Sequence, residues 1–97
     1  MENQLSIQVS PEVADGVYSN LAIISHASSE FVLDFVRILP NVQQAQVKSR
    51  IILTPEHAMR LYHALQDNLN KYQARFGEIK MPKDNGNIPM SFNGGEA

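Results

Sequence analysis

The chain has 97 residues, of which 43% are hydrophobic and 19% charged, and these values predict one small globular domain. Its formal net charge of -2 argues against general binding to nucleic acid or to an anionic membrane. The absence of cysteine from the sequence excludes a disulfide framework, a thiolate zinc site and a cysteine nucleophile.

The N-terminal segment predicts a short edge strand followed by a turn. Leu5, Ile7 and Val9 alternate with polar residues, which is the period-two pattern of a strand. Pro11 ends this pattern. Residues 11–16 then predict a turn or a single helical turn, in which Gly16 is free to take a positive φ.

The run from Val17 to Leu39 predicts two further strands with apolar side chains on both faces. Residues 17–25 form the first of these strands, and residues 26–29 form the turn after it. The next strand begins at Glu30 or Phe31 and is closed by Pro40 and Asn41. Residues 46–53 predict a fourth strand.

A long helix is the element that the sequence specifies most completely, and it should run from Pro55 to Phe76. Thr54 is a suitable N-cap, and Pro55 occupies the first helical position, where its missing N–H costs nothing. Gly77 follows the last turn, as is typical of a helix C-terminus. Three- and four-residue spacing gives one apolar stripe, formed by Ala58, Leu61, Tyr62, Leu65, Leu69, Tyr72 and Phe76.

Turns centred on Ser28 and Val42 fix a register in which the two faces of the sheet differ. The richer face is the expected bed for the helix, and it carries Leu21, Ile23, Phe31, Leu33 and Phe35. On the reverse face Asp34 falls opposite Arg50, so the register predicts a structural ion pair between these two residues.

The apolar residues of that reverse face form a candidate interface, because monomers usually avoid so large an exposed apolar patch. They are Tyr18, Ile24, Val32, Val36, Ile38 and Ile52. Stacking of this face on its copy would give a homodimer or a higher homo-oligomer. The alternative is that the N-terminal strand or the C-terminal tail of the same chain covers it.

The predicted fold class is therefore α+β, with a four-stranded antiparallel β-meander and one long C-terminal helix packed on one face. Residues 1–79 form this single domain. Residues 80–97 are rich in proline, glycine and asparagine and predict a flexible tail, with docking of the tail on a partner as the alternative.

The sequence offers no catalytic, cofactor-binding or metal-binding pattern, so we expect a protein that is not an enzyme. His57 and His63 are six residues apart on the helix, whereas a metal pair needs three- or four-residue spacing. His26 lies in a turn. Asp34 has the predicted partner Arg50, and the serines lie outside any nucleophile elbow.

Several segments resemble a bacterial and archaeal family, domain of unknown function 3467. They include Y-S-N-L-A-I-I-S-H (residues 18–26), E-F-V-L-D-F (30–35), S-R-I-I-L-T-P-E-H-A (49–58) and L-Q-D-N-L-N-K-Y (65–72). The resemblance implies no established activity, and it suggests a transcription-associated partner. The order of elements is also similar to that of the export chaperone SecB, which suggests a chaperone-like use of apolar surface.

The leading expectation is a non-enzymatic, self-associating module that binds an unidentified protein. The alternatives are a nucleic-acid-associated regulator, which the acidic charge balance disfavours, and a small-ligand-binding or enzymatic module. The N-terminus does not resemble a signal peptide, and no apolar run approaches the roughly 20 residues that span a bilayer. We therefore expect a cytoplasmic protein.

Overall fold

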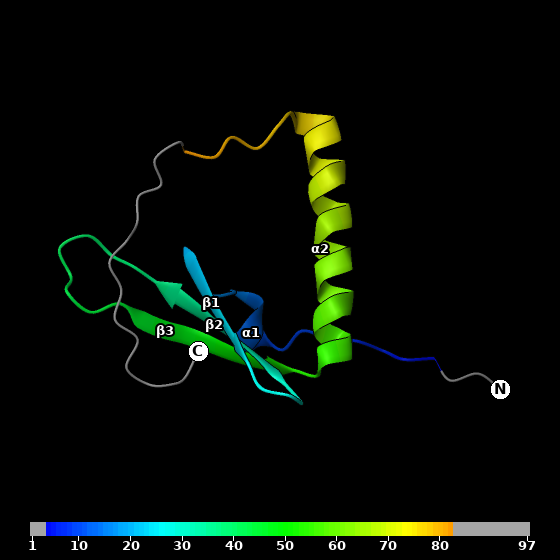
Figure 1. Cartoon of the computed structure of the whole chain (residues 1–97), viewed down its shortest axis with the longest axis horizontal. Helices are drawn as coiled ribbons and strands as arrows, with labels where there is room; N and C mark the ends of the chain where they lie inside the picture. The colour runs from blue at the N-terminus through cyan, green and yellow to red at the C-terminus, as the bar shows by residue number, and fades with distance from the viewer. Residues whose placement is uncertain (1–3, 83–97) are drawn as a thin grey trace. The chain divides into compact units, whose positions relative to one another are not determined.

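The computed structural model describes residues 4–82, which form a three-stranded antiparallel sheet and two helices (Figure 1). The elements in chain order are α1 (Pro11–Ala14), β1 (Leu21–His26), β2 (Phe31–Arg37), β3 (Gln46–Leu53) and α2 (Pro55–Phe76). The strands lie in the order β1-β2-β3. The predicted α+β class and the long C-terminal helix are confirmed.

The prediction of a strand at residues 5–9, which would have made the sheet four-stranded, is wrong, because the described part of the chain forms three strands. Leu5 and Ile7 are each 84% exposed. Alternation of apolar and polar residues sets the faces of a strand, but a strand also needs a neighbour for its backbone groups. The turn after this segment is confirmed: α1 is a single turn, and Gly16 takes a φ of 79°.

Strand β1 begins at Leu21 and not at Val17, because the side chain of Asn20 bonds the backbone of Ile38, the residue that follows β2. The Asn20 amide donates from Nδ2 to the carbonyl of Ile38 (3.1 Å) and accepts through Oδ1 from the Ile38 N–H (2.8 Å). These bonds replace the predicted pairing of Tyr18 with Ile38. The backbone N–H of Asn20 donates to the carbonyl of Val36 (3.0 Å), as the predicted register requires.

Two turns connect the three strands. In the first, the N–H of Ala27 donates to the carbonyl of Glu30 (2.9 Å), and the ring of His26 stacks on that of Phe31 with 5.3 Å between centroids. In the second, Asn41 takes a φ of 61°, a left-handed conformation that asparagine tolerates better than most residues. Strand β3 then has the predicted bounds.

Strand β2 is central in the sheet and carries the described residues that are buried. Leu33 is 8% exposed, Val36 is 4% exposed and Asp34 is 1% exposed. Neighbours on both sides shield a central strand, whereas each edge strand leaves one side open. The chain divides into two compact units, and the boundary between them crosses all three strands. Residues 34 to 50 belong to one unit, and α2 belongs to the other.

Helix α2 has the predicted bounds and the predicted ends. The hydroxyl of Thr54 accepts from the His57 N–H (3.2 Å), and Gly77, at a φ of 100°, donates its N–H to the carbonyl of Gln73 (2.9 Å). Packing of this helix on one face of the sheet stays a prediction. The structure describes the chain only as far as Pro82, so most of the predicted tail (residues 80–97) lies outside the described residues.

Candidate interaction surface

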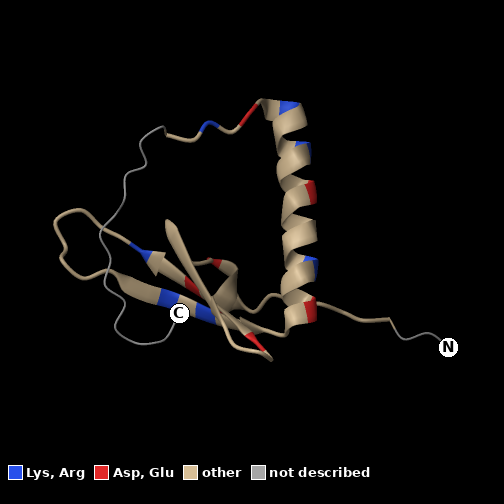
Figure 2. Cartoon of the chain, in the orientation of Figure 1, with Lys and Arg blue, Asp and Glu red and all other residues tan. Residues whose placement is uncertain are grey.

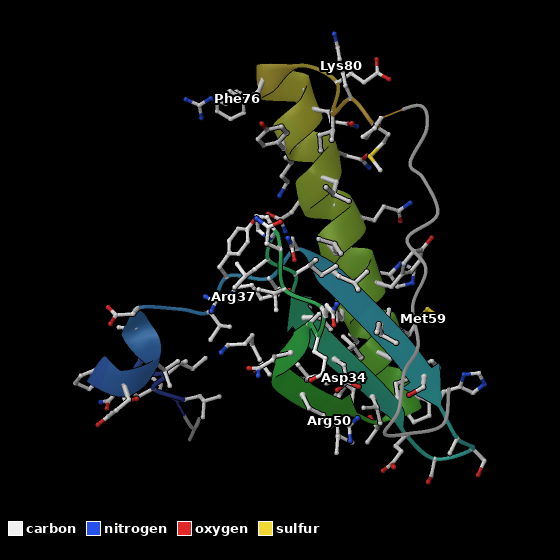
Figure 3. All side chains as sticks on the ribbon, turned by 90° about the vertical axis from the view of Figure 1, so that its left-hand side faces the viewer. Asp34, Arg37, Arg50, Met59, Phe76 and Lys80 are labelled. Carbon is white, nitrogen blue, oxygen red and sulfur yellow. The ribbon has the colours of Figure 1, made fainter. Side chains whose placement is uncertain are left out.

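The predicted partners Asp34 and Arg50 lie against one another on neighbouring strands, β2 and β3 (Figure 3). The Nε of Arg50 lies 2.6 Å from Oδ1 of Asp34, and Nη2 lies 2.9 Å from Oδ2. Both carboxylate oxygens are therefore engaged by one guanidinium in a parallel fork, which is the strongest geometry for this pair.

The electrostatics of this pair favour the charged form of both groups. The hydrogen bonds from Arg50 lower the pKa of the Asp34 carboxyl below its ordinary value of 3.8, although burial opposes this effect, and the positive charge of Arg50 lowers it further. The hydrogen bonds and the charge of Asp34 in turn raise the pKa of Arg50. A carboxylate held ionised and fully bonded is suited to a structural role and not to accepting a proton.

The exposure of the two partners differs sharply. The side chain of Asp34 is 1% exposed, while that of Arg50 is 49% exposed. The guanidinium therefore covers the carboxylate and keeps one side in solvent. In residues 4–82 every buried side-chain polar atom has a hydrogen-bond partner, so this pair leaves no unsatisfied group at the centre of the sheet.

The six residues predicted as an interface on the reverse face of the sheet fall into three classes. Tyr18, Ile24 and Ile52 are exposed, at 69%, 59% and 58%. Val32 and Ile38 are half-buried. Val36 is buried at 4% exposure, so this residue is not available to a partner, and the prediction that it contributes to an interface is wrong.

The most extensive exposed apolar surface of one element lies along α2. Tyr62, Leu65 and Leu69 are 56%, 54% and 42% exposed, and none of the helix residues is buried. The spacing is regular: steps of four and three residues alternate along the helix. We call this set the α2 seam: Ala58, Tyr62, Leu65, Leu69, Tyr72 and Phe76.

The C-terminal half of the seam borders a shallow apolar groove. The rings of Tyr72 and Phe76 lie 5.0 Å apart between centroids, at 43° to each other. Ile79 lines the same groove, and its N–H donates to Oε1 of Gln73 (2.9 Å). Ile79 follows Phe76 by three residues, so it continues the spacing of the predicted stripe beyond the end of the helix.

Charged residues occur along the whole length of α2 (Figure 2). Two of them, Lys71 and Arg75, line the groove beside the seam, and the Arg75 guanidinium lies 5.2 Å from the centre of the Phe76 ring. Arg60 donates to Glu56 (2.9 Å), and Lys71 lies 3.1 Å from Asp67, both at a spacing of four residues. Such exposed pairs contribute little to stability. The six seam residues themselves are uncharged, and the nearest positive charge at the C-terminal end of the seam is that of Arg75 over the Phe76 ring.

The three histidines are scattered among the described elements. His26 ends β1, His57 lies in the first turn of α2, and His63 has its ring 5.1 Å from that of Tyr62. Across residues 4–82 no three histidine, aspartate or glutamate residues come close enough together to hold a metal ion. Neither described helix combines the length and the apolar character that crossing a bilayer requires.

Comparison with known proteins gives a family. The model of DUF3467, described as a protein of unknown function, matches residues 1–81. The chain belongs to the DUF3467 family. The predicted resemblance is therefore confirmed. Neither a curated protein nor a solved structure matches the chain.

Membership of DUF3467 brings no activity to this chain, so the case for a function must come from its own surfaces. Two features remain after the ion pair is assigned to the sheet. One is the α2 seam, and the other is the pair of exposed apolar residues Ile24 of β1 and Ile52 of β3. Both are apolar, and large exposed apolar surfaces are typical of protein-protein contact.

Proposed function

We propose that this DUF3467 protein is a non-enzymatic, self-associating module that binds other proteins. The observation that carries the proposal is the exposure of the α2 seam. Leu65, Tyr72 and Phe76 are 54%, 50% and 65% exposed in the single chain. Covering such a surface removes apolar area from water, at about 25 cal/mol per Å², and a second protein surface is the usual cover.

The composition of the seam supports a protein partner in preference to a small ligand. The seam is long and open, whereas small-molecule sites are concave and enclose most of their ligand. Tyrosine and phenylalanine, which are enriched at protein interfaces, provide half of its six residues. The exposed pair of Arg60 and Glu56, whose side chains are 71% and 67% exposed, keeps the other side of the helix in water.

Two experiments test the proposal. Size-exclusion chromatography with light scattering measures the mass of the purified chain over a dilution series, and we expect a dimer or larger that dissociates on dilution. A monomer of 10.9 kDa throughout the series would contradict self-association. Purification from the native host with mass spectrometry then identifies heterologous partners, with a chain carrying Leu65→Glu as the matched control.

A further inference from the structure

The spacing of the α2 seam has a property that a general apolar stripe lacks. Its residues follow a heptad repeat, in which Tyr62, Leu69 and Phe76 take one position, and the other position is taken by Ala58, Leu65 and Tyr72. This 3.5-residue period keeps a seam aligned with a second helix along its length. Helix α2 has 22 residues and is therefore about 33 Å long.

We infer that α2 pairs with α2 of a second copy in antiparallel orientation, centred on Asp67. This inference rests on the proposed self-association and names its surface and geometry. In this pair, residues of one heptad position face residues of the other heptad position in the second copy. Each pair of facing residues has its midpoint at Asp67, which is therefore the centre. Leu65 then meets Leu69 of the second copy, Tyr62 meets Tyr72, and Ala58 meets Phe76.

Side-chain volumes favour the antiparallel arrangement over the parallel one. In the antiparallel pair the smallest seam residue, Ala58, lies opposite the large Phe76 at both ends, which fills space evenly. In a parallel pair Ala58 would face Ala58 and leave a void, while Phe76 would face Phe76. The antiparallel pair therefore gives six layers of matched size.

Charge favours the same arrangement. The basic residues Lys71 and Arg75 lie toward the C-terminal end of α2, and Glu56 lies in its first turn. A parallel pair would gather the basic residues of both copies at one end and align the two helix dipoles, which is unfavourable. The antiparallel pair separates these like charges by most of the length of the helix.

The residues that flank the seam are also compatible with this centre. Close to it lie Gln66 and Asn68, whose uncharged amides would face their own copies across the two-fold axis. Further out, Arg75 would lie beside Leu61 of the second copy, so no like charges oppose each other at the flanks. The five large seam residues are 42% to 65% exposed. Covering the seam in both copies would bury on the order of 1,000 Å² in total, which is a small interface.

Spin-label distances test the geometry directly, because the sequence lacks cysteine and single cysteine variants can be labelled cleanly. Gln66→Cys and Met59→Cys lie on the same edge of the seam, one near the centre and one seven residues away. With the helix rise of 1.5 Å per residue and helices about 10 Å apart, we expect the distance between copies to be roughly 15 Å longer at residue 59 than at residue 66.

Each outcome of this experiment decides something. A short distance at residue 66 and a long one at residue 59 support the antiparallel pair. Equal distances at the two positions would overturn it in favour of a parallel pair. Dimers by light scattering without a short distance at residue 66 would overturn the helix pair and leave the proposed self-association standing, whereas monomers would overturn both.

A pair of charge variants provides the second measurement. Leu65→Glu places two carboxylates in the central layers of the pair, and we expect at least a hundredfold weaker dimerisation. Ala74→Glu adds the same charge to the same helix on the side away from the seam, and its dimer should persist. Helical content by circular dichroism verifies that both variants fold, and an undiminished dimer of folded Leu65→Glu would refute the inference.

Discussion

Truncation of Leu69 to alanine tests how much the α2 seam contributes to self-association. The side chain of Leu69 is 42% exposed in the single chain, and the helix pair would cover this fraction with Leu65 of the second copy. Full burial of a leucine contributes about 2 kcal/mol, so covering the remaining fraction contributes about 1 kcal/mol.

The symmetry of a dimer doubles this effect. Each pair contains two copies of Leu69, so Leu69→Ala should weaken dimerisation by about 2 kcal/mol, which corresponds to roughly a 30-fold increase in Kd. Alanine has at least the helix propensity of leucine, so the substitution leaves the helix itself intact. A loss of affinity therefore reports on the interface and not on helix formation.

Sedimentation equilibrium over a dilution series measures the Kd of each variant. The matched control is Asn70→Ala, which makes the same residue at the next position, on the side away from the seam. We expect the control to stay within about threefold of the wild type, because an exposed outer position changes stability little. If Leu69→Ala and Asn70→Ala have the same Kd, the assignment of the seam as the interface is refuted.

Two further predictions concern the sheet. Because the pKa of Asp34 is lowered in the folded chain, its ion pair stabilises the fold above pH 3.8 and loses that contribution as pH falls from there through the lower folded pKa. Asp34→Asn should cost about 1 kcal/mol at neutral pH, since Arg50 is half in solvent and the pair is screened. Urea unfolding, with Asp67→Asn as the control, measures this cost, and a difference from wild type that does not shrink as the pH falls below 3.8 would contradict it. Asn20→Ala should remove the protection of the Ile38 N–H from hydrogen exchange, whereas Asn20→Asp keeps the acceptor and most of that protection; equal exchange in both variants would show that the side chain does not close this end of β1.

The ends of α2 were predictable because each depends on neighbouring residues alone. Thr54 supplies the capping oxygen, Pro55 fits the first helical position, and Gly77 takes the positive φ that ends the helix. The facing of Asp34 and Arg50 was also predictable, since turn lengths and the alternation of apolar residues fix a register. The structure places both carboxylate oxygens of Asp34 against the guanidinium.

The start of β1 was not predictable from its pattern. Val17 and Tyr18 have good strand propensity, yet the strand begins three residues after Tyr18 because the Asn20 side chain occupies the N–H and the carbonyl of Ile38. Asparagine often competes with the backbone in this way. The signal was present in the sequence, but its partner lies 18 residues away and is known only from the folded chain.

The sequence by itself determined the local features of this protein: the bounds and caps of α2, the bounds of β3, and the register that sets Asp34 against Arg50. Each follows from backbone conformation, turn length or side-chain periodicity within a short segment. Tertiary structure alone decided that residues 5–9 do not join the sheet and that Val36 is buried while the α2 seam is exposed. These outcomes depend on whether a second surface covers a given side chain or backbone group, and an alternating or heptad pattern specifies a face without specifying what lies against it.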